Sequence, residues 1–172
     1  QNTDQTLALI LARASNSIPN PDIQSQKTLA DIAYKPGPRR VFTHPDAHQA
    51  LVWALAMSPD GQTLASGSAD GTVKLWNTAD ASLRETLMLD SGEVYTVDFS
   101  PDGRYLAMGT HSGRIIVRDV TDGSQFTLEM HQDTVNSLTF SPVDSNVLVS
   151  TSDDGTARLW HMDTRQSLRF IA

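Results

Sequence analysis

Apolar and polar residues alternate in short runs along most of this chain, and the same pattern occurs three times. Three segments align with one another: Ser58–Asn77, Ser100–Asp119 and Ser141–His161. A turn glycine recurs every 42 residues, at Gly71, Gly113 and Gly155. Repetition at this spacing predicts an array of structural units, each of which buries its apolar faces against its neighbours.

Each repeat predicts four short β-strands. Runs rich in β-branched and aromatic residues, bounded by turn residues, are typical of strands. In chain order the predicted strands are 52–57, 63–68, 72–76 and 83–88, then 94–99, 105–110, 114–118 and 124–129, then 135–140, 147–152, 156–160 and 167–171. The sequence therefore predicts three four-stranded sheets joined by tight turns.

Turn residues separate the strands at corresponding places. In the first two repeats Ser-Pro-Asp-Gly follows the first strand, with Pro presetting φ and Gly taking the left-handed corner. A two-residue turn then joins the second and third strands, at Asp70-Gly71, Ser112-Gly113 and Asp154-Gly155. Such a turn is typical of a β-hairpin. In the third repeat the segment 142–146 lacks the glycine and has one residue more, so we expect its first turn to differ in type.

From about Arg39 to the C-terminus these repeats resemble the WD-repeat β-propeller family. The resemblance implies an all-β fold of four-stranded blades, in an incomplete ring over residues 39–172. The three expected blades cover about 44–88, 89–130 and 131–172. The Trp-Asp pair that names the family is never intact, and the repeats have Trp76-Asn77, Arg118-Asp119 and Trp160-His161 in its place.

The resemblance also implies a hydrogen-bonded tetrad of His, Ser or Thr, Asp and Trp that holds the strands of a blade together. The matching residues are His48, Ser66, Asp70 and Trp76 in the first repeat and His131, Ser150, Asp154 and Trp160 in the third. The second repeat has Asp90, Met108, Ser112 and Arg118 at these places, so we expect no tetrad there. His44 is an alternative to His48, which we prefer for its four-residue spacing to Val52.

Ser, His and Asp also make up hydrolase triads, which need one activated nucleophile in a cleft beside an oxyanion site. Here the set occurs twice at the same repeat positions, each time with Trp as a fourth member, so a structural network is the better interpretation. A propeller hydrolase with an axial metal would need converging ligands from several first strands, whose inner rows contain only Asp98. We expect no catalytic residue, no metal and no cofactor, and keep the hydrolase as the weaker alternative.

The first 38 residues have a different pattern. Asp4 can cap a helix over residues 5–14, and Asn20-Pro21 can begin a second helix. We expect a helical hairpin or linker over residues 1–38 that leads into the first blade. This arrangement is similar to connectors in large bacterial signalling proteins, which suggests a bacterial signalling or regulatory protein.

Composition excludes several partner classes. The chain has 172 residues, with 20 Asp and Glu against 13 Lys and Arg and a formal charge of −7, which argues against nucleic-acid binding. The basic cluster of Lys35, Arg39 and Arg40 is better interpreted as a solvated linker. The apolar run Leu7–Ala12 is too short to span a bilayer and lacks the plan of a signal peptide. Without cysteine there is no disulfide framework. We expect a cytoplasmic protein that binds neither nucleic acid nor a membrane.

Three blades are fewer than the 4–8 with which propellers close. Leaving apolar sheet faces exposed to water costs about 25 cal/mol of folding free energy per Å² of apolar surface. Two explanations stay open. The chain is a fragment of a longer protein with further blades in cis, as its start at Gln1 suggests, or copies of it assemble through their blade edges.

The family resemblance implies that the protein binds partners through its surface and does not catalyse a reaction, because most such propellers are platforms for protein partners. In the family, the partner-facing positions flank the first-strand Val and precede the turn Asp. Carried over, these positions are Leu51, Trp53, Ala69, Glu93, Tyr95, His111, Thr134, Asn136 and Asp153. Trp53 and Tyr95 are residue types typical of interaction hot spots. We therefore expect a non-catalytic scaffold in a larger signalling or regulatory protein.

Overall fold

The computed structural model describes residues 47–171, and this part of the chain consists of strands and turns with no helix. The first sheet contains β1 (Val52–Met57), β2 (Thr63–Ser68), β3 (Thr72–Asn77) and β4 (Leu83–Met88). The second contains β5 (Val94–Phe99), β6 (Tyr105–Thr110), β7 (Arg114–Asp119) and β8 (Gln125–Glu129). The third contains β9 (Val135–Phe140), β10 (Val147–Ser152), β11 (Ala157–His161) and β12 (Gln166–Ile171).

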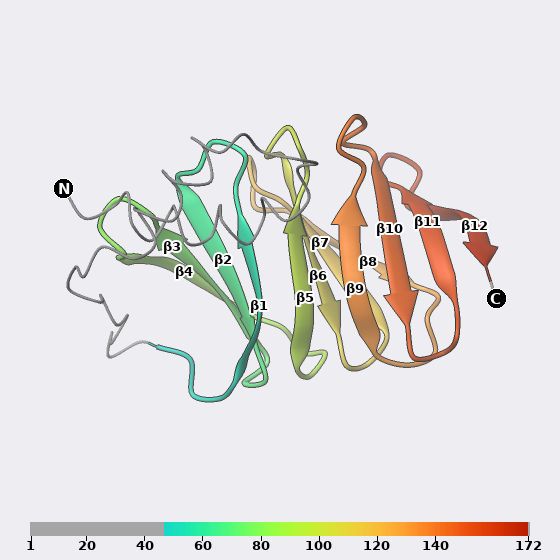
Figure 1. Cartoon of the computed structure of the whole chain (residues 1–172), viewed down its shortest axis with the longest axis horizontal. Helices are drawn as coiled ribbons and strands as arrows, with labels where there is room; N and C mark the ends of the chain where they lie inside the picture. Colours follow the sequence, from blue (N-terminus) through green and yellow to red (C-terminus); the bar gives the residue numbers. More distant parts are fainter. Residues whose placement is uncertain (1–46, 172) are drawn as a thin grey trace, which may run out of the picture. The chain divides into compact units, whose positions relative to one another are not determined.

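Each sheet is antiparallel and its strands lie in chain order (Figure 1). We call the three sheets the first, second and third blade. The predicted strands and the all-β class are confirmed, with bounds shifted by a residue at some strand ends. The expected helical hairpin at 1–38 lies outside the described residues.

The turns form as their residues require. Between the second and third strands of each blade a glycine has positive φ: 78° at Gly71, 81° at Gly113 and 79° at Gly155. In the first turn of the first blade, the Ser58 N–H donates to the Thr63 carbonyl at 2.8 Å. The corresponding bond in the third blade runs from the Ser141 N–H to the carbonyl of Val147, one residue farther along, also at 2.8 Å. The expected difference in that turn is confirmed.

The first strands of the three blades lie side by side, with β5 in contact with both β1 and β9 (Figure 1). One apolar cluster fills the space between the first and second blades and a second cluster fills the space between the second and third. The β5 residues Val94, Val97 and Phe99 are buried in the first cluster. Their counterparts Val135, Leu138 and Phe140 in β9 are buried in the second. Blade-to-blade packing is therefore where most of the described core lies.

Side chains of β5 also accept hydrogen bonds from the backbone of β9. The Leu138 N–H donates to Thr96 Oγ1 at 3.2 Å, and the Phe140 N–H donates to Asp98 Oδ2 at 2.8 Å. Burial raises the pKa of Asp98, against the opposing effect of backbone N–H donors from Phe140 and Phe99. Asp98, the carboxylate considered as an axial metal ligand, therefore joins two blades.

No helix that is long and apolar enough to cross a membrane occurs in residues 47–171.

Candidate functional site

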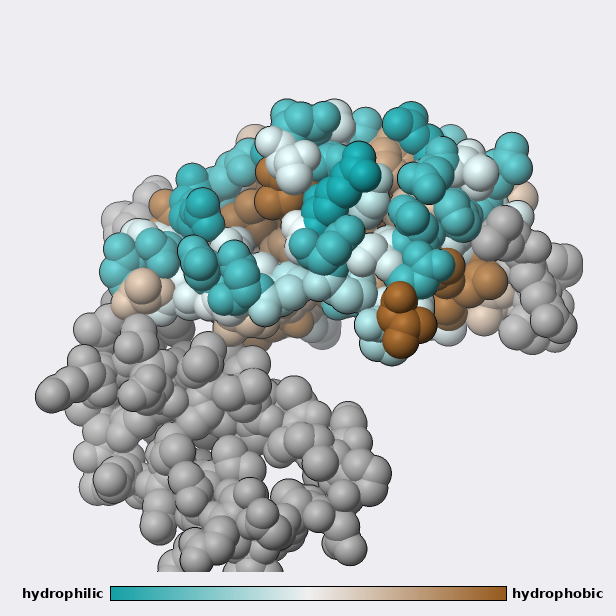
Figure 2. Space-filling model, turned by 90° about the horizontal axis from the view of Figure 1, so that it is seen from above, coloured by the Kyte–Doolittle hydropathy of each residue, from teal (hydrophilic) through white to brown (hydrophobic). Residues whose placement is uncertain are grey.

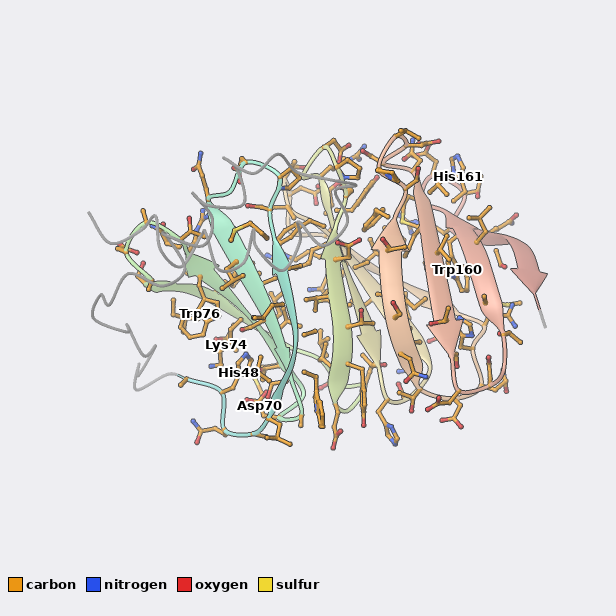
Figure 3. All side chains as sticks on the ribbon, viewed as in Figure 1. His48, Asp70, Lys74, Trp76, Trp160 and His161 are labelled. Carbon is orange, nitrogen blue, oxygen red and sulfur yellow. The ribbon has the colours of Figure 1, made fainter. Side chains whose placement is uncertain are left out.

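The first blade contains the network of His48, Ser66, Asp70 and Trp76, of which Figure 3 labels all but Ser66. His48 Nδ1 lies 3.0 Å from Asp70 Oδ2, and His48 Nε2 lies 2.7 Å from Ser66 Oγ. Trp76 Nε1–H donates to the same serine oxygen at 2.8 Å. A single direction of donation satisfies all three bonds: indole to hydroxyl, hydroxyl to Nε2, and Nδ1–H to carboxylate. The bonds tie β2 and β3 to the segment before β1.

The third blade repeats this geometry. His131 Nδ1 lies 2.9 Å from Asp154 Oδ2, and His131 Nε2 lies 2.7 Å from Ser150 Oγ. Trp160 Nε1–H donates to Ser150 Oγ at 2.8 Å. We call these two networks the staples. The structure brings all eight tetrad residues together in the two sets that the sequence suggested; His44 lies outside the described residues.

Both staple carboxylates have lowered pKa values. Partial burial of Asp70 raises its pKa, but hydrogen bonds from Thr72, from the Gln49 backbone N–H and from His48 outweigh burial and lower it to about 2. At Asp154, burial is again opposed by Thr156, by the Gln132 backbone and by His131, and the pKa falls well below its usual range. Each staple is therefore built around an ionised carboxylate at neutral pH.

The staples leave no group for hydrolysis. A catalytic serine needs an accessible hydroxyl beside an oxyanion site. Ser66 and Ser150 are buried, and each Oγ already binds an indole N–H and an imidazole nitrogen. Three or more His, Asp or Glu side chains that could hold a metal do not gather anywhere in residues 47–171.

The second blade has no staple among its described residues. Met108 is fully buried in the first apolar cluster, and Ser112 Oγ lies 3.1 Å from Thr110 Oγ1. Arg118 reaches the first blade, where its Nη2 donates to both oxygens of Glu85 at 2.9 and 3.1 Å. Apolar packing and one ion pair between blades therefore take the place of the polar network.

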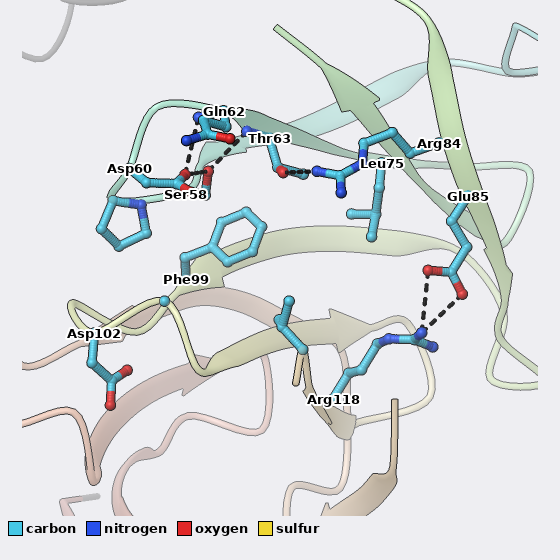
Figure 4. A pocket seen from close by; sticks show the side chains of 13 residues that line it. Ser58, Asp60, Gln62, Thr63, Leu75, Arg84, Glu85, Phe99, Asp102 and Arg118 are labelled. Atoms are coloured by element: carbon cyan, nitrogen blue, oxygen red, sulfur yellow. Dashed lines mark hydrogen bonds and ion pairs between the residues drawn. The ribbon is translucent and has the colours of Figure 1, made fainter. Parts of the chain in front are cut away.

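Replacement of Trp by Arg118 accompanies a cleft that sequence reasoning missed. The cleft, of about 530 Å³, lies between the first and second blades (Figure 4). Leu75 and Phe99 line it together with Arg118. Arg84, which also lines the cleft, donates to Thr63 Oγ1 at 2.7 Å. The signal available in the sequence was Arg118 itself, which occupies the position of Trp76 and Trp160 in the other two repeats.

The carried-over partner positions gather at one end of the blades. They lie at the beginnings of β1, β5 and β9 and at the turns between second and third strands, which is the lower end in Figure 1. The Trp53 and Tyr95 rings stack with centroids 5.6 Å apart and planes 6° apart. His111 also stacks on Tyr95, with ring centroids 6.1 Å apart, and its Nδ1 lies 3.0 Å from Thr134 Oγ1. We call this run of four residues across three blades the ladder.

The remaining positions flank the ladder. Asn136 Nδ2 donates to Asp153 Oδ1, and Tyr95 Oη donates to Glu93 Oε2 at 3.0 Å. The bond to Glu93, followed by desolvation and the charges of Glu93 and Asp153, raises the pKa of Tyr95. Leu51 is exposed to 65% and Trp53 to 48%, whereas Thr134 is buried and Ala69 half-buried. The structure thus joins most of these positions in one surface, with Leu51 and Ala69 beside it.

The opposite end carries the turns β1–β2, β5–β6 and β9–β10. Figure 2 shows that end, where hydrophilic residues cover most of the visible surface and hydrophobic residues form separate patches. One exposed apolar residue there is Val143, exposed to 92%. The stacked rings of Trp53, Tyr95 and His111 lie at the ladder end, away from these turns.

Comparison with protein families gives a match to the model described as "WD domain, G-beta repeat" over residues 38–77, 83–119 and 123–161. The chain is 38% identical over 109 residues to "WD repeat-containing protein SL1-17" of Schistosoma mansoni, covering 63% of the chain and 36% of that protein. It is 27% identical over 130 residues to "Nuclear distribution protein nudF" of Aspergillus niger, covering 73% and 29%. These relatives are eukaryotic, and nothing in them supports the expected bacterial origin.

A human relative, "DDB1- and CUL4-associated factor 5", is 30% identical over 126 residues, covering 70% of the chain and 13% of that protein. Among solved structures, "Crystal structure of RRP9 WD40 repeats" superimposes with a TM-score of 0.70 at 24% identity, covering 73% of this chain and 39% of that one. The chain spans about a third or less of the length of the curated relatives named here. The likeness to the solved structure shows the propeller-blade fold.

Proposed function

Because the chain belongs to the WD40 repeat family, we propose that its blades are a non-catalytic platform whose ladder end binds a protein partner. The matched family is a structural repeat, and its description names no reaction. The staples hold the blades in shape, and the exposed rings provide the contact surface. The names of the relatives refer to different processes and identify no common partner.

One observation carries this proposal: the stacked run from Trp53 through Tyr95 and His111 to Thr134. Each of these residues lies in a strand or beside one, so the surface is fixed before a partner arrives. Rigid aromatic groups bury area at little conformational cost, and interface energy concentrates on such residues. The row also crosses all three blades, which gives a partner one continuous contact.

The charges around the ladder favour a basic segment in that partner. Glu93 and Asp153 flank Tyr95 closely enough to raise its pKa. Asp90 and Asp133 lie at the same end, in the segments before β5 and β9. A cation of the partner is attracted both by these carboxylates and by the faces of the rings. The same charges support a partner other than nucleic acid, whose phosphates they would repel.

The test is a screen of the purified chain against a displayed peptide library, followed by binding measurements on the captured peptides. We expect captured sequences to be rich in Lys or Arg and their affinity to fall as salt rises. Trp53→Ala and Tyr95→Ala should each abolish capture while leaving the thermal melt nearly unchanged.

The matched control is Val143→Ala, which removes an exposed apolar side chain from the opposite end. It should leave capture intact. Capture that survives both ladder substitutions, or that Val143→Ala removes equally, would show that the partner binds elsewhere.

A further inference from the structure

The two internal blade interfaces share a close contact that depends on glycine. In each, the first valine of the later blade packs against a glycine in the second strand of the earlier blade. A Cβ atom at Gly67 would lie 2.8 Å from Cγ1 of Val94, and one at Gly109 would lie 2.8 Å from Cγ1 of Val135. A Cβ atom at Gly109 would also lie 2.6 Å from Cγ2 of Thr96 in its own blade. Contacts this short do not occur between carbon atoms, so a larger residue at either place requires the valine to move, and at Gly109 the threonine as well.

The third blade has a threonine at this place. Strand pairing establishes the equivalence, because each of the three residues lies opposite corresponding residues of the first and third strands of its blade. The pairs are Gly67 with Ala54 and Val73, Gly109 with Thr96 and Ile115, and Thr151 with Ser137 and Ala157. The outward face of the third blade therefore presents Thr151 where the two internal interfaces have glycine.

Between the second and third strands of the blade, the order of side-chain sizes at this position is also reversed. In the second blade a glycine lies opposite the large Ile115, whereas in the third Thr151 lies opposite the small Ala157. Two residues earlier in the same strand, Val149 takes the place of Ala65 and Ala107. The smaller residue of the pair therefore lies on the third strand in the third blade and on the second strand in the other two blades.

The first blade presents the opposite partner surface. Val52 is exposed to 49% and Leu55 to 60%, while the corresponding residues Val94 and Val97 are buried at the internal interface. If a second copy docked its first blade on the third blade in the same manner, its Val52 would meet Thr151. Two β-branched side chains would then have to share the space that a single valine fills at each internal interface.

We propose that the outward face of the third blade binds a four-stranded blade of different sequence, with Gly, Ala or Ser at the place of Val94 and Val135. The same face binds the first blade of a second copy of this chain more weakly, because Thr151 and Val52 overpack. We infer a blade as the binding partner because it would continue the packing of the two internal interfaces. Thr151 limits the size of the residue that this blade can have at the place of Val94 and Val135.

Backbone hydrogen bonding does not make this selection. Thr96 and Asp98 accept N–H groups of the next blade. Ser137 and Thr139 occupy the same positions in β9, and their hydroxyls can accept such bonds from any incoming strand. The discrimination is steric and lies at Thr151 and Val149.

Sedimentation velocity of the full chain over a range of protein concentrations tests the proposal. Val52→Ala shrinks the incoming residue, and Thr151→Gly restores the glycine. Each variant should assemble at a concentration about tenfold or more below that of the wild type, because each relieves the same overpacking. The double variant should return toward the wild type, since both sides are then small and a void is left.

General hydrophobic adhesion gives the opposite expectation, because Val52→Ala removes exposed apolar surface and should weaken assembly. Wild-type oligomers that Val52→Ala dissolves would show that a second copy is the true occupant. Variants that sediment like the wild type at every concentration would also overturn the proposal. Val52→Ala alters an exposed side chain, so it keeps the test decisive if Thr151→Gly weakens its strand.

Discussion

The staples and the ladder are built from similar kinds of residue, but the rings of the ladder are more exposed than those of the staples. His131, in a staple, has a fully buried side chain between Asp154 and Ser150. His111, in the ladder, is exposed and lies between Tyr95 and Thr134. Residue type alone does not separate structural from binding roles. Burial and satisfied hydrogen bonds mark the structural role, and a row of stacked rings that reaches the surface marks the binding role.

Replacing a tryptophan by alanine should give the largest difference in stability between the staples and the ladder. Trp160 is 1% exposed, so Trp160→Ala should lower the free energy of unfolding by about 3–5 kcal/mol through cavity formation and loss of the indole bond. Trp53→Ala, on the surface, should change it by less than about 1 kcal/mol. Urea titrations of both variants provide the measurement. Similar losses for the two would mean that the ladder tryptophan is also part of the core.

The staple carboxylates should give the next largest effect. Asp70→Ala and Asp154→Ala each leave buried partners unpaired and should cost about 1–3 kcal/mol. Ser112→Ala, at the corresponding place in the blade without a staple, should cost much less. Equal losses at all three positions in denaturant melts would contradict the structural role assigned to the staples.

Acid should weaken the staples in a defined range of pH. The pKa of Asp70 is about 2 in the folded chain and 3.8 as the reference value, so its stabilising contribution is complete above the reference value. That contribution is lost as pH falls from about 4 through about 2. Asp70→Asn should therefore flatten the dependence of unfolding free energy on pH in this range. An unchanged slope would show that the carboxylate is not responsible.

The smallest expected effect is at the hydroxyl of Tyr95. Tyr95→Phe keeps the ring that stacks on Trp53 and removes the bond to Glu93. Partner affinity should fall by about 0.5–1.5 kcal/mol, well short of the loss from Tyr95→Ala. Calorimetric titration with a captured peptide distinguishes the two. A Phe variant as weak as the Ala variant would assign the binding to the hydroxyl and not to the ring.

Strands and turns could be predicted because local signals specify them, whereas the staples were implied by the resemblance to a family whose blades carry this tetrad. Alternating apolar residues and turn glycines set the strand bounds, and the staple residues recur at matched places in two repeats. Their distances nonetheless had to come from the structure.

Contacts between blades could not be predicted in the same way. Stacking of Trp53 on Tyr95 depends on the separation of β1 and β5, and the ion pair of Arg118 with Glu85 joins residues far apart in sequence. The cleft beside Arg118 is lined by residues of two blades, and no single segment encodes it. Long-range packing is thus where the sequence pattern stops being informative.

Hydrogen–deuterium exchange of the chain with and without a captured peptide tests the binding role of the ladder most directly. We expect slower exchange on binding in the segments around Glu93–Tyr95, His111 and Thr134–Asn136, and no change in the turns at 58–62 and 141–146. Protection confined to those turns, with none along the ladder, would contradict the account.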